Sequence, residues 1–150
     1  MKHAELVALE NHCGYRYLFN FRGVAASFRY KHLFLCGSLV FQVGDKWQEF
    51  FYPALKPWVH YIPVEEDLSD AEQLLDWAAN HQAEAQAIAD RGFAFVRDNL
   101  RQEDVRDYWR ELLGQYARLQ RWAPKLEPGV EKHVMKPQDR AMLDQLVAYT

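Results

Sequence analysis

The sequence predicts an α/β fold in which a partial Rossmann-like parallel sheet is followed by several helices. The first supporting observation is a strand–helix–strand pattern in residues 15–43, whose middle segment is long enough to connect two parallel strands. The second is a change of pattern near residue 69, after which apolar residues recur at helical spacing. Three expected strands are few for a complete doubly wound sheet, so we expect the chain to be part of a larger domain.

Composition limits the class of protein. The chain has 150 residues, 49% hydrophobic and 15% aromatic, which is enough to bury the core of one domain. A net charge of −3 argues against broad binding of nucleic acid. No apolar run approaches the roughly 18 residues of a membrane span. Residues 1–10 lack the apolar centre of a signal peptide and the C-terminal LVAYT is no retrieval signal, so we expect no targeting segment in this sequence.

The first half of the chain contains the expected strands. Residues 15–21, YRYLFNF, alternate aromatic and polar side chains and predict a strand. Residues 24–34 predict a helix, with Gly37 as its stop signal. Residues 38–43, SLVFQV, predict a buried strand that ends at Gly44-Asp45.

The next segment contains two prolines and predicts irregular structure. Residues 46–57 are expected to hold at most one helical turn, because Pro53 and Pro57 interrupt regular structure. Residues 58–62, WVHYI, predict a third strand that Pro63 closes.

The rest of the chain predicts helices. Ser69 and Glu72 form a capping-box pattern that begins the first of them. Two further helices are predicted at residues 82–99 and 103–121, and a short one at residues 137–148. We therefore expect one domain at residues 1–122 and a C-terminal extension at residues 123–150. The expected inner face of the 103–121 helix consists of Val105, Tyr108, Trp109, Leu112, Leu113, Tyr116 and Leu119.

The segment after the first strand predicts an anion site. Ligands of parallel sheets bind at the carboxyl ends of the strands, which is where Gly23 permits close approach to the backbone. The small residues Ala25, Ala26 and Ser27 leave the first helical turn open to a phosphate. Arg29, and more weakly Arg22, supplies a guanidinium for a diphosphate. The same residues also fit an ordinary tight strand-to-helix junction, and neither a G-x-G-x-x-G nor a Walker A pattern is present.

Other polar residues are weaker candidates. Asp45 follows the second strand and is placed to reach a sugar hydroxyl, although a Gly-Asp pair also fits a plain turn; Glu49 is placed to bind a ribose. The six histidines show no ligand spacing, so we expect no metal. No triad or carboxylate pair stands out, so we expect no catalytic residue in this chain. Cys13 and Cys36 are expected at the opposite end of the sheet, where a disulfide and two free thiols fit equally well.

Residues 13–64 resemble the C-terminal half of the protein O-glucosyltransferases of the Rumi type, which belong to the CAP10-like glycosyltransferase family. The resemblance is carried by the run YLFNFRGVAASFRYKHLFLCGSLVFQVGDKWQEFFYPALKPWVHYIPV. The likeness continues more loosely to about residue 120. It implies the C-terminal half of an enzyme with two Rossmann domains, the fold class known as GT-B. It also implies that Cys13 and Cys36 form a disulfide and that the protein works in the lumen of the endoplasmic reticulum.

The resemblance further implies the reaction. The family transfers glucose from UDP-glucose, or xylose from UDP-xylose, to a serine of an epidermal-growth-factor-like repeat, with inversion and without a metal or other cofactor. The residues that match its donor-binding motif are Val24, Ala25, Ala26, Ser27, Phe28 and Arg29. Its catalytic base is an aspartate of the N-terminal half, so we expect the isolated chain to be inactive. The alternative is a truncated, non-enzymatic product that only binds a nucleotide or a partner.

Overall fold

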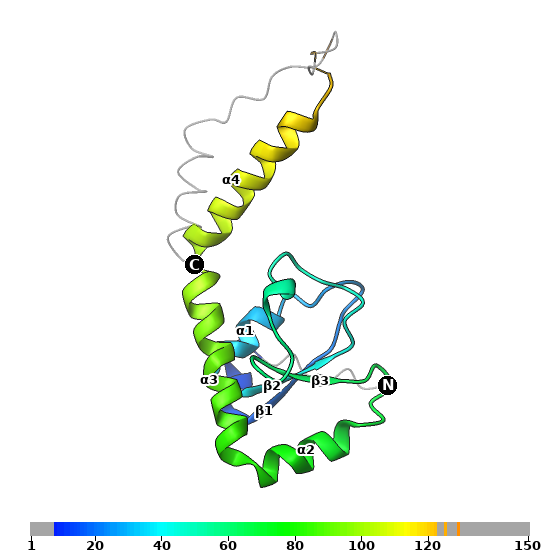
Figure 1. Ribbon diagram of the computed structural model, residues 1–150, viewed down its shortest axis with the longest axis vertical. Helices are drawn as coiled ribbons and strands as arrows, with labels where there is room; N and C mark the ends of the chain where they lie inside the picture. The colour runs from blue at the N-terminus through cyan, green and yellow to red at the C-terminus, as the bar shows by residue number, and fades with distance from the viewer. Residues whose placement is uncertain (1–7, 123–124, 126–128, 130–150) are drawn as a thin grey trace. The chain divides into compact units, whose positions relative to one another are not determined.

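A computed structural model describes residues 8–122, 125 and 129. The chain divides into two compact units, residues 1–110 and 111–150. The first contains a sheet of three strands in the order β1 (Tyr17–Asn20), β2 (Leu39–Val43) and β3 (Ile62–Val64) (Figure 1). This arrangement, with helices after the sheet, confirms the predicted α/β class.

All three strands run parallel, as the length of the crossover predicted. β1 pairs with β2 from Tyr17 opposite Leu39 to Asn20 opposite Gln42. β2 pairs with β3 from Phe41 opposite Ile62 onward. Every residue of the central strand β2 is buried, which explains why it reads as a continuous apolar run rather than an alternation.

The third strand differs from its prediction. It covers Ile62–Val64 instead of residues 58–62, and Pro63 lies inside it rather than closing it. Trp58 has a φ of 62° and donates its backbone N–H to the carbonyl of Tyr61, so this part of the expected strand is a turn. Pro63 is tolerated because β3 pairs with β2 alone among the described strands, which leaves the other side of β3 without a ladder to interrupt.

The first helix is also shorter than predicted. The helix α1 covers only Tyr30–Phe34, and residues 24–29 form a bent loop before it. The carbonyl of Ser27 accepts a hydrogen bond from Tyr30 N in a turn, which delays the first helical residue. Gly37, with a φ of 68°, ends the segment as expected.

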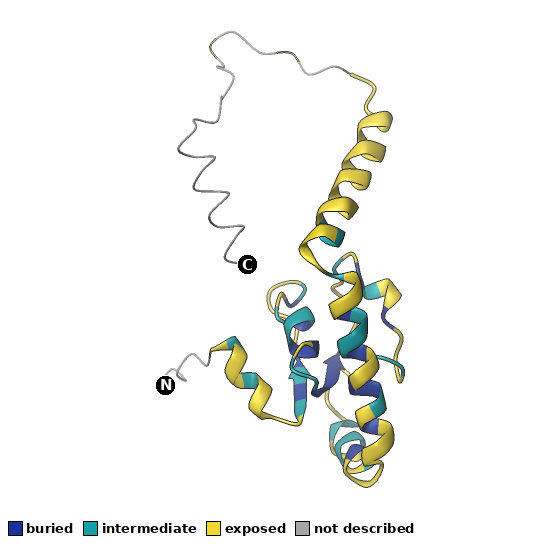
Figure 2. Ribbon diagram, turned by 90° about the vertical axis from the view of Figure 1, so that its left-hand side faces the viewer, coloured by how far each residue is buried: buried dark blue, intermediate teal, exposed yellow. Residues whose placement is uncertain are grey.

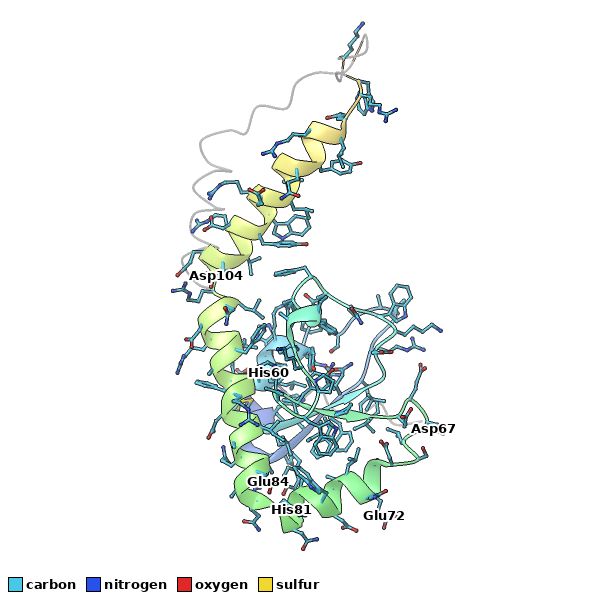
Figure 3. All side chains as sticks on the ribbon, in the orientation of Figure 1. His60, Asp67, Glu72, His81, Glu84 and Asp104 are labelled. Carbon is cyan, nitrogen blue, oxygen red and sulfur yellow. A yellow bond between two sulfur atoms is a disulfide. The ribbon has the colours of Figure 1, made fainter. Side chains whose placement is uncertain are left out.

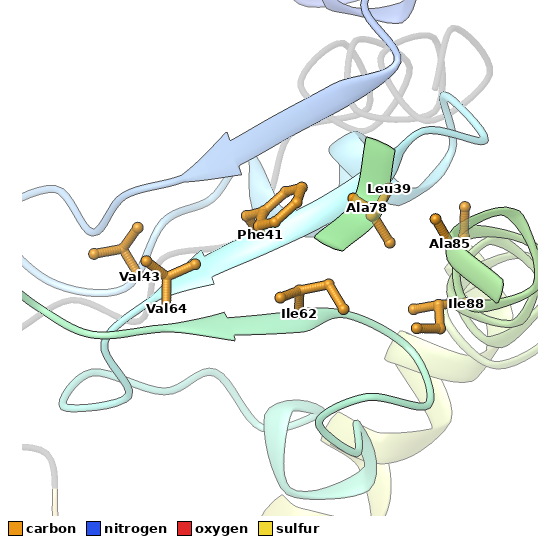
Figure 4. Packing of buried hydrophobic residues seen from close by; sticks show 9 residues of the cluster. Leu39, Phe41, Val43, Ile62, Val64, Ala78, Ala85 and Ile88 are labelled. Carbon is orange, nitrogen blue, oxygen red and sulfur yellow. The ribbon is translucent and has the colours of Figure 1, made fainter. Parts of the chain in front are cut away.

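One face of the sheet is covered by the helices α2 (Ala71–Asn80) and α3 (Gln82–Asn99). Figure 4 shows side chains of the sheet meeting side chains of these two helices. Alternate residues of β2 and β3 contribute to this cluster, because successive side chains of a strand point to opposite faces. The buried members are Leu39, Phe41, Val43, Ile62, Val64, Ala78, Ala85, Ile88 and Ala89.

The opposite face is covered by α1, by the 3-10 turn η2 (Tyr52–Ala54) and by the C-terminal part of α3. Tyr30 is the centre of this second cluster, with its ring centroid 4.8 Å from those of both Phe34 and Tyr52. The single turn η2 confirms the prediction for residues 46–57. The buried members are Leu18, Tyr30, Leu33, Phe34, Val40, Phe51, Leu55 and Val96.

Cys13 and Cys36 form a disulfide. It joins the 3-10 turn η1 (Leu9–Gly14) to the end of α1. A cross-link over 23 residues restricts the unfolded chain and contributes on the order of 3 kcal/mol in the chain-entropy model. The sequence alone left a disulfide and two free thiols as alternatives, and the structure contains the disulfide.

The start of α2 differs from expectation. The N-cap of α2 is Asp70, without a capping hydrogen bond from its side chain, so the Ser69–Glu72 capping box does not form. Instead, the Asp70 carboxylate accepts a hydrogen bond from Glu65 N, and that of Asp67 accepts one from Ser69 N, so these side chains shape the loop before the helix.

The helix α4 (Gln102–Leu119) has no buried residue, and most of its expected inner face is exposed (Figure 2). Helical periodicity in the sequence predicts an apolar face, but it does not show which residues pack against that face. Tyr108 stacks on Phe50, with ring centroids 4.2 Å apart. No helix among the described residues is long and apolar enough to cross a membrane. The short helix expected at 137–148 lies outside the described residues.

Replacing Gly92 with alanine is expected to destabilise the protein. A Cβ at this position of α3 would lie 2.5 Å from the carbonyl oxygen of His60 and 2.7 Å from Cδ1 of Phe34. Because a backbone atom cannot move aside easily, we expect a loss of about 1–3 kcal/mol in the free energy of unfolding, measured by urea denaturation. The matched control is Gly114→Ala in α4, where no atom of another described side chain or strand lies within 4 Å of the added Cβ. That substitution is expected to raise helix content, and a Gly92→Ala variant as stable as the parent would contradict the prediction.

Candidate functional site

The carboxyl ends of β1, β2 and β3 meet at one edge of the sheet, and the loops that follow them surround the candidate site. An ion pair links the first loop to the third, with 3.5 Å between Arg22 Nε and Glu66 Oε1. Arg22 and Gly23 line a cavity there together with Phe21, Val43 and Glu66. Two of the weaker site candidates from the sequence are thus at this edge, and the guanidinium of Arg22 already has a carboxylate partner.

The loop at residues 24–29 presents an unusual run of backbone donors. Within the described part of the chain, the amides of residues 24–26, 28 and 29 donate to no acceptor. The side chains of Val24 and Phe28 are 97% and 68% exposed, so they do not cover this backbone from solvent. Free backbone N–H groups carry partial positive charge and can donate hydrogen bonds to an anion.

Arg29 adds a full positive charge to the same loop. It is the N-cap residue of α1, and its guanidinium makes no ion pair or hydrogen bond with any described residue. The expectation that small residues open a first helical turn to phosphate is corrected, because α1 has only five residues and begins after Arg29. The donors come from the loop itself rather than from a helix dipole.

Ser27 and Glu49 each have a neighbour within the protein. Ser27 is buried, and its backbone amide faces the hydroxyl of Tyr52. Burial, followed by the negative charge of Glu49, raises the pKa of Tyr52 to about 12, so this hydroxyl remains protonated. Glu49 Oε2 lies 3.6 Å from Lys31 Nζ of α1, so the carboxylate expected to bind a ribose has a partner within the protein.

Asp45 lies on the rim of a larger cavity between the second and third loops. Its volume is about 460 Å³. Four of its lining residues are acidic and none is lysine or arginine. Among the others, Trp58 and Tyr61 supply aromatic surface. The acidic members are Asp45, Glu65, Glu66 and Asp70.

A pair of buried amides lies at the ends of β1 and β2. Asn20 Nδ2 donates to Gln42 Oε1 at 2.6 Å, and Gln42 Nε2 donates to the carbonyl of Gly44 at 2.8 Å. The two residues are opposite each other in the β1–β2 register. The sequence analysis did not predict this pair. The available signal was a polar side chain near the carboxyl end of each of two apolar strands that were expected to be parallel.

The described residues contain no group of three or more histidine, cysteine, aspartate or glutamate side chains arranged to hold a metal ion. The carboxylates around Asp45 therefore line a cavity without converging on one point.

Comparisons with known proteins identify relatives of this chain. A family model described as glycosyl transferase family 90 matches residues 1–146. Human Protein O-glucosyltransferase 1 is 60% identical over 115 residues, which are 77% of this chain and 29% of the human protein. The rumi O-glucosyltransferase of Drosophila melanogaster is 55% identical over 126 residues, which are 83% of this chain and 31% of the fly protein. An O-glucosyltransferase rumi homolog of Aedes aegypti is 58% identical over 126 residues.

The chain spans about a third or less of the length of these relatives. The matches confirm the resemblance drawn from residues 13–64.

Protonation of His60 is expected to loosen the turn that carries Trp58. The Nδ1 atom of His60, labelled in Figure 3, accepts a hydrogen bond from Lys56 N at 2.9 Å, which requires the unprotonated nitrogen. Burial, followed by the charges of Arg91 and Lys56, lowers the pKa of His60 below 6.5. The unfolded chain therefore binds more protons at His60 than the folded chain does as the pH falls. The contribution of His60 to stability is fully present above the pKa of the unfolded state and is lost as the pH falls through the pKa of the folded state.

We therefore expect the free energy of unfolding to decrease between about pH 7 and about pH 5. The variant His60→Asn keeps an acceptor without titrating and should show a smaller decrease, measured by urea denaturation at each pH. Part of the decrease should remain, because burial also lowers the pKa of His32. An equal decrease in parent and His60→Asn would contradict the prediction.

Proposed function

Because the chain belongs to glycosyl transferase family 90, we propose that it is the donor-binding portion of an inverting, UDP-sugar-dependent protein O-glucosyltransferase. The observation that supports this most directly is the loop at residues 24–29. It combines backbone amides and an Arg29 guanidinium that have no partner among the described residues, at the edge of the sheet where parallel folds bind ligands. A diphosphate matches both kinds of donor.

The proposed role of the loop is to hold the diphosphate and to stabilise it as a leaving group. Negative charge accumulates on the UDP oxygens as the bond to the sugar breaks, so Arg29 and the loop amides act more strongly in the transition state than in the bound donor. Arg22 is a secondary candidate, since it must share its charge with Glu66. The proposal assigns no step to a metal.

The names of the relatives indicate the sugar. Both human and fly relatives are O-glucosyltransferases, which favours UDP-glucose as donor over UDP-xylose. The proposed acceptor is a serine of an epidermal-growth-factor-like repeat. We place the catalytic base and most of the acceptor site in the portion of such an enzyme that the aligned segment does not include. The disulfide between Cys13 and Cys36 supports an oxidising compartment, which we propose is the lumen of the endoplasmic reticulum.

Titration of the chain with UDP in a calorimeter tests donor binding. Replacing Arg29 with alanine is expected to weaken UDP binding by about 10- to 100-fold, since one charge-assisted hydrogen-bonding partner is lost. The matched control is Arg97→Ala, because Arg97 pairs with Asp98 within α3. Equal affinity of parent and Arg29→Ala would contradict the role of Arg29, and absence of UDP binding by the folded chain would contradict the proposed donor site.

The isolated chain is expected to transfer no glucose. With UDP-glucose and a folded acceptor repeat, mass spectrometry should detect no glucosylated serine. Adding a separately produced segment of a relative, N-terminal to the aligned region, should restore transfer if the chain is part of an enzyme. Turnover by the isolated chain would show that the base lies within it. UDP binding without any restored transfer would favour the alternative, a non-enzymatic product that retains the nucleotide site.

A further inference from the structure

The C-terminal half of α4 carries an apolar face that the structure leaves exposed. Its side chains recur three and four residues apart, so they lie on one side of the helix. They are between 39% and 76% exposed (Figure 2). An apolar surface of this kind typically marks a site of interaction. We call these residues the α4 face: Leu112, Leu113, Tyr116 and Leu119.

A cavity of about 310 Å³ lies at the C-terminal end of the α4 face. Trp122, which is 67% exposed, extends the aromatic surface beyond Leu119, the last residue of the helix. Amphipathic helices commonly dock by placing apolar side chains in hollows between side chains such as these. The lining residues are Tyr116, Leu119, Gln120, Arg121 and Trp122.

The charges of α4 favour another helix over a membrane surface or nucleic acid as the partner. Acidic and basic residues are mixed along the helix, and Arg110 pairs with Asp107 one turn before it. A helix that lies on a membrane carries an excess of lysine and arginine on its polar face, and a nucleic-acid surface is likewise basic. The α4 face therefore fits the apolar side of a second amphipathic helix.

The chain itself contains a segment with such a side. Residues 137–148 lie outside the described residues, but their sequence predicts an amphipathic helix. Residues 111–150 form one of the two compact units of the chain, so the α4 face and this segment belong to the same unit. The apolar residues that recur at helical spacing in the segment are Met142, Leu143, Leu146 and Val147.

The covalent connection favours this segment over a second copy of the chain. Residues 120–136 join α4 to the segment, which is long enough for the chain to reverse along a face of about 12 Å. A tether of this kind gives one segment an effective concentration on the order of 1 mM at the other. A second copy at micromolar protein is about a thousandfold more dilute, so the tethered segment occupies the face first.

We propose that residues 137–148 dock as a helix on the α4 face, so that the end of the chain forms a helical hairpin that covers its own apolar surface. Burial of the two apolar sides against each other removes them from water and stabilises both helices. The hairpin also keeps the face from associating with other chains. The inference does not depend on donor binding at residues 24–29.

Hydrogen–deuterium exchange of the 150-residue chain, followed by mass spectrometry at micromolar concentration, tests the contact. Leu146→Asp places a charge in the docked side of the segment. The amides of residues 112–119 are expected to exchange about tenfold faster in this variant, because α4 loses its cover. Gln145→Asp adds the same charge outside the apolar side and is the matched control, with exchange as in the parent. Equal exchange of these amides in the parent and Leu146→Asp would overturn the proposal.

A second substitution tests whether the two sides contact each other. Leu112→Asp is expected to speed the exchange of residues 142–148 about tenfold, and adding Leu146→Asp should cause no further loss of protection, because both changes break one contact. Additive losses would overturn the hairpin.

The other occupants of the face give different results. Protection of residues 112–119 that appears only as the protein concentration rises, together with a dimer in analytical ultracentrifugation, would assign the face to a second copy. Protection that appears only after addition of the N-terminal segment of a relative would assign it to that segment. Either result would overturn the proposal, which expects a monomer with protection independent of concentration.

Discussion

Parallel pairing of β1 with β2, and of β2 with β3, is the constraint on which the rest of the structure depends. It brings the three strand ends to one edge, so the loops that begin at Phe21, Gly44 and Glu65 are neighbours although they are far apart in sequence. It also divides the side chains of each strand between two faces, and each face has its own apolar cluster. The pair Asn20 and Gln42 fastens this arrangement at the site edge by a buried hydrogen bond.

The helix α3 connects the two faces. Its N-terminal half contributes Ala85 and Ile88 to one cluster, and its C-terminal half contributes Val96 to the other. Gly92 lies between them, where the helix passes too close to His60 and Phe34 to carry any side chain. The sheet and α3 together form a packed scaffold for the loops of the site. Binding residues on loops are commonly held in position by such a scaffold.

Two chemically different regions share the site edge. The loop at residues 24–29 offers free amides and Arg29, which suit an anion, whereas four acidic residues line the cavity beside Asp45. Glu66 contacts both, since it lines the acidic cavity and pairs with Arg22 near the loop. A charged diphosphate matches the loop rather than the cavity, which supports the proposed function in a chain that spans about a third or less of its relatives' length.

The sequence by itself determined the class of fold, the parallel strands β1 and β2, the helix α3, the stop at Gly37 and the family, because each depends on local pattern or on matched residues. Other features depended on distant contacts. The start of α1 depends on the buried Ser27 turn. The position of β3 depends on an edge that pairs with no other described strand and therefore accepts Pro63. The partners of Arg22 and Glu49 are brought to them only when segments separated in the sequence meet. Local pattern records the preferences of a segment, whereas partners and cavities are properties of the space between segments, which only the tertiary structure decides.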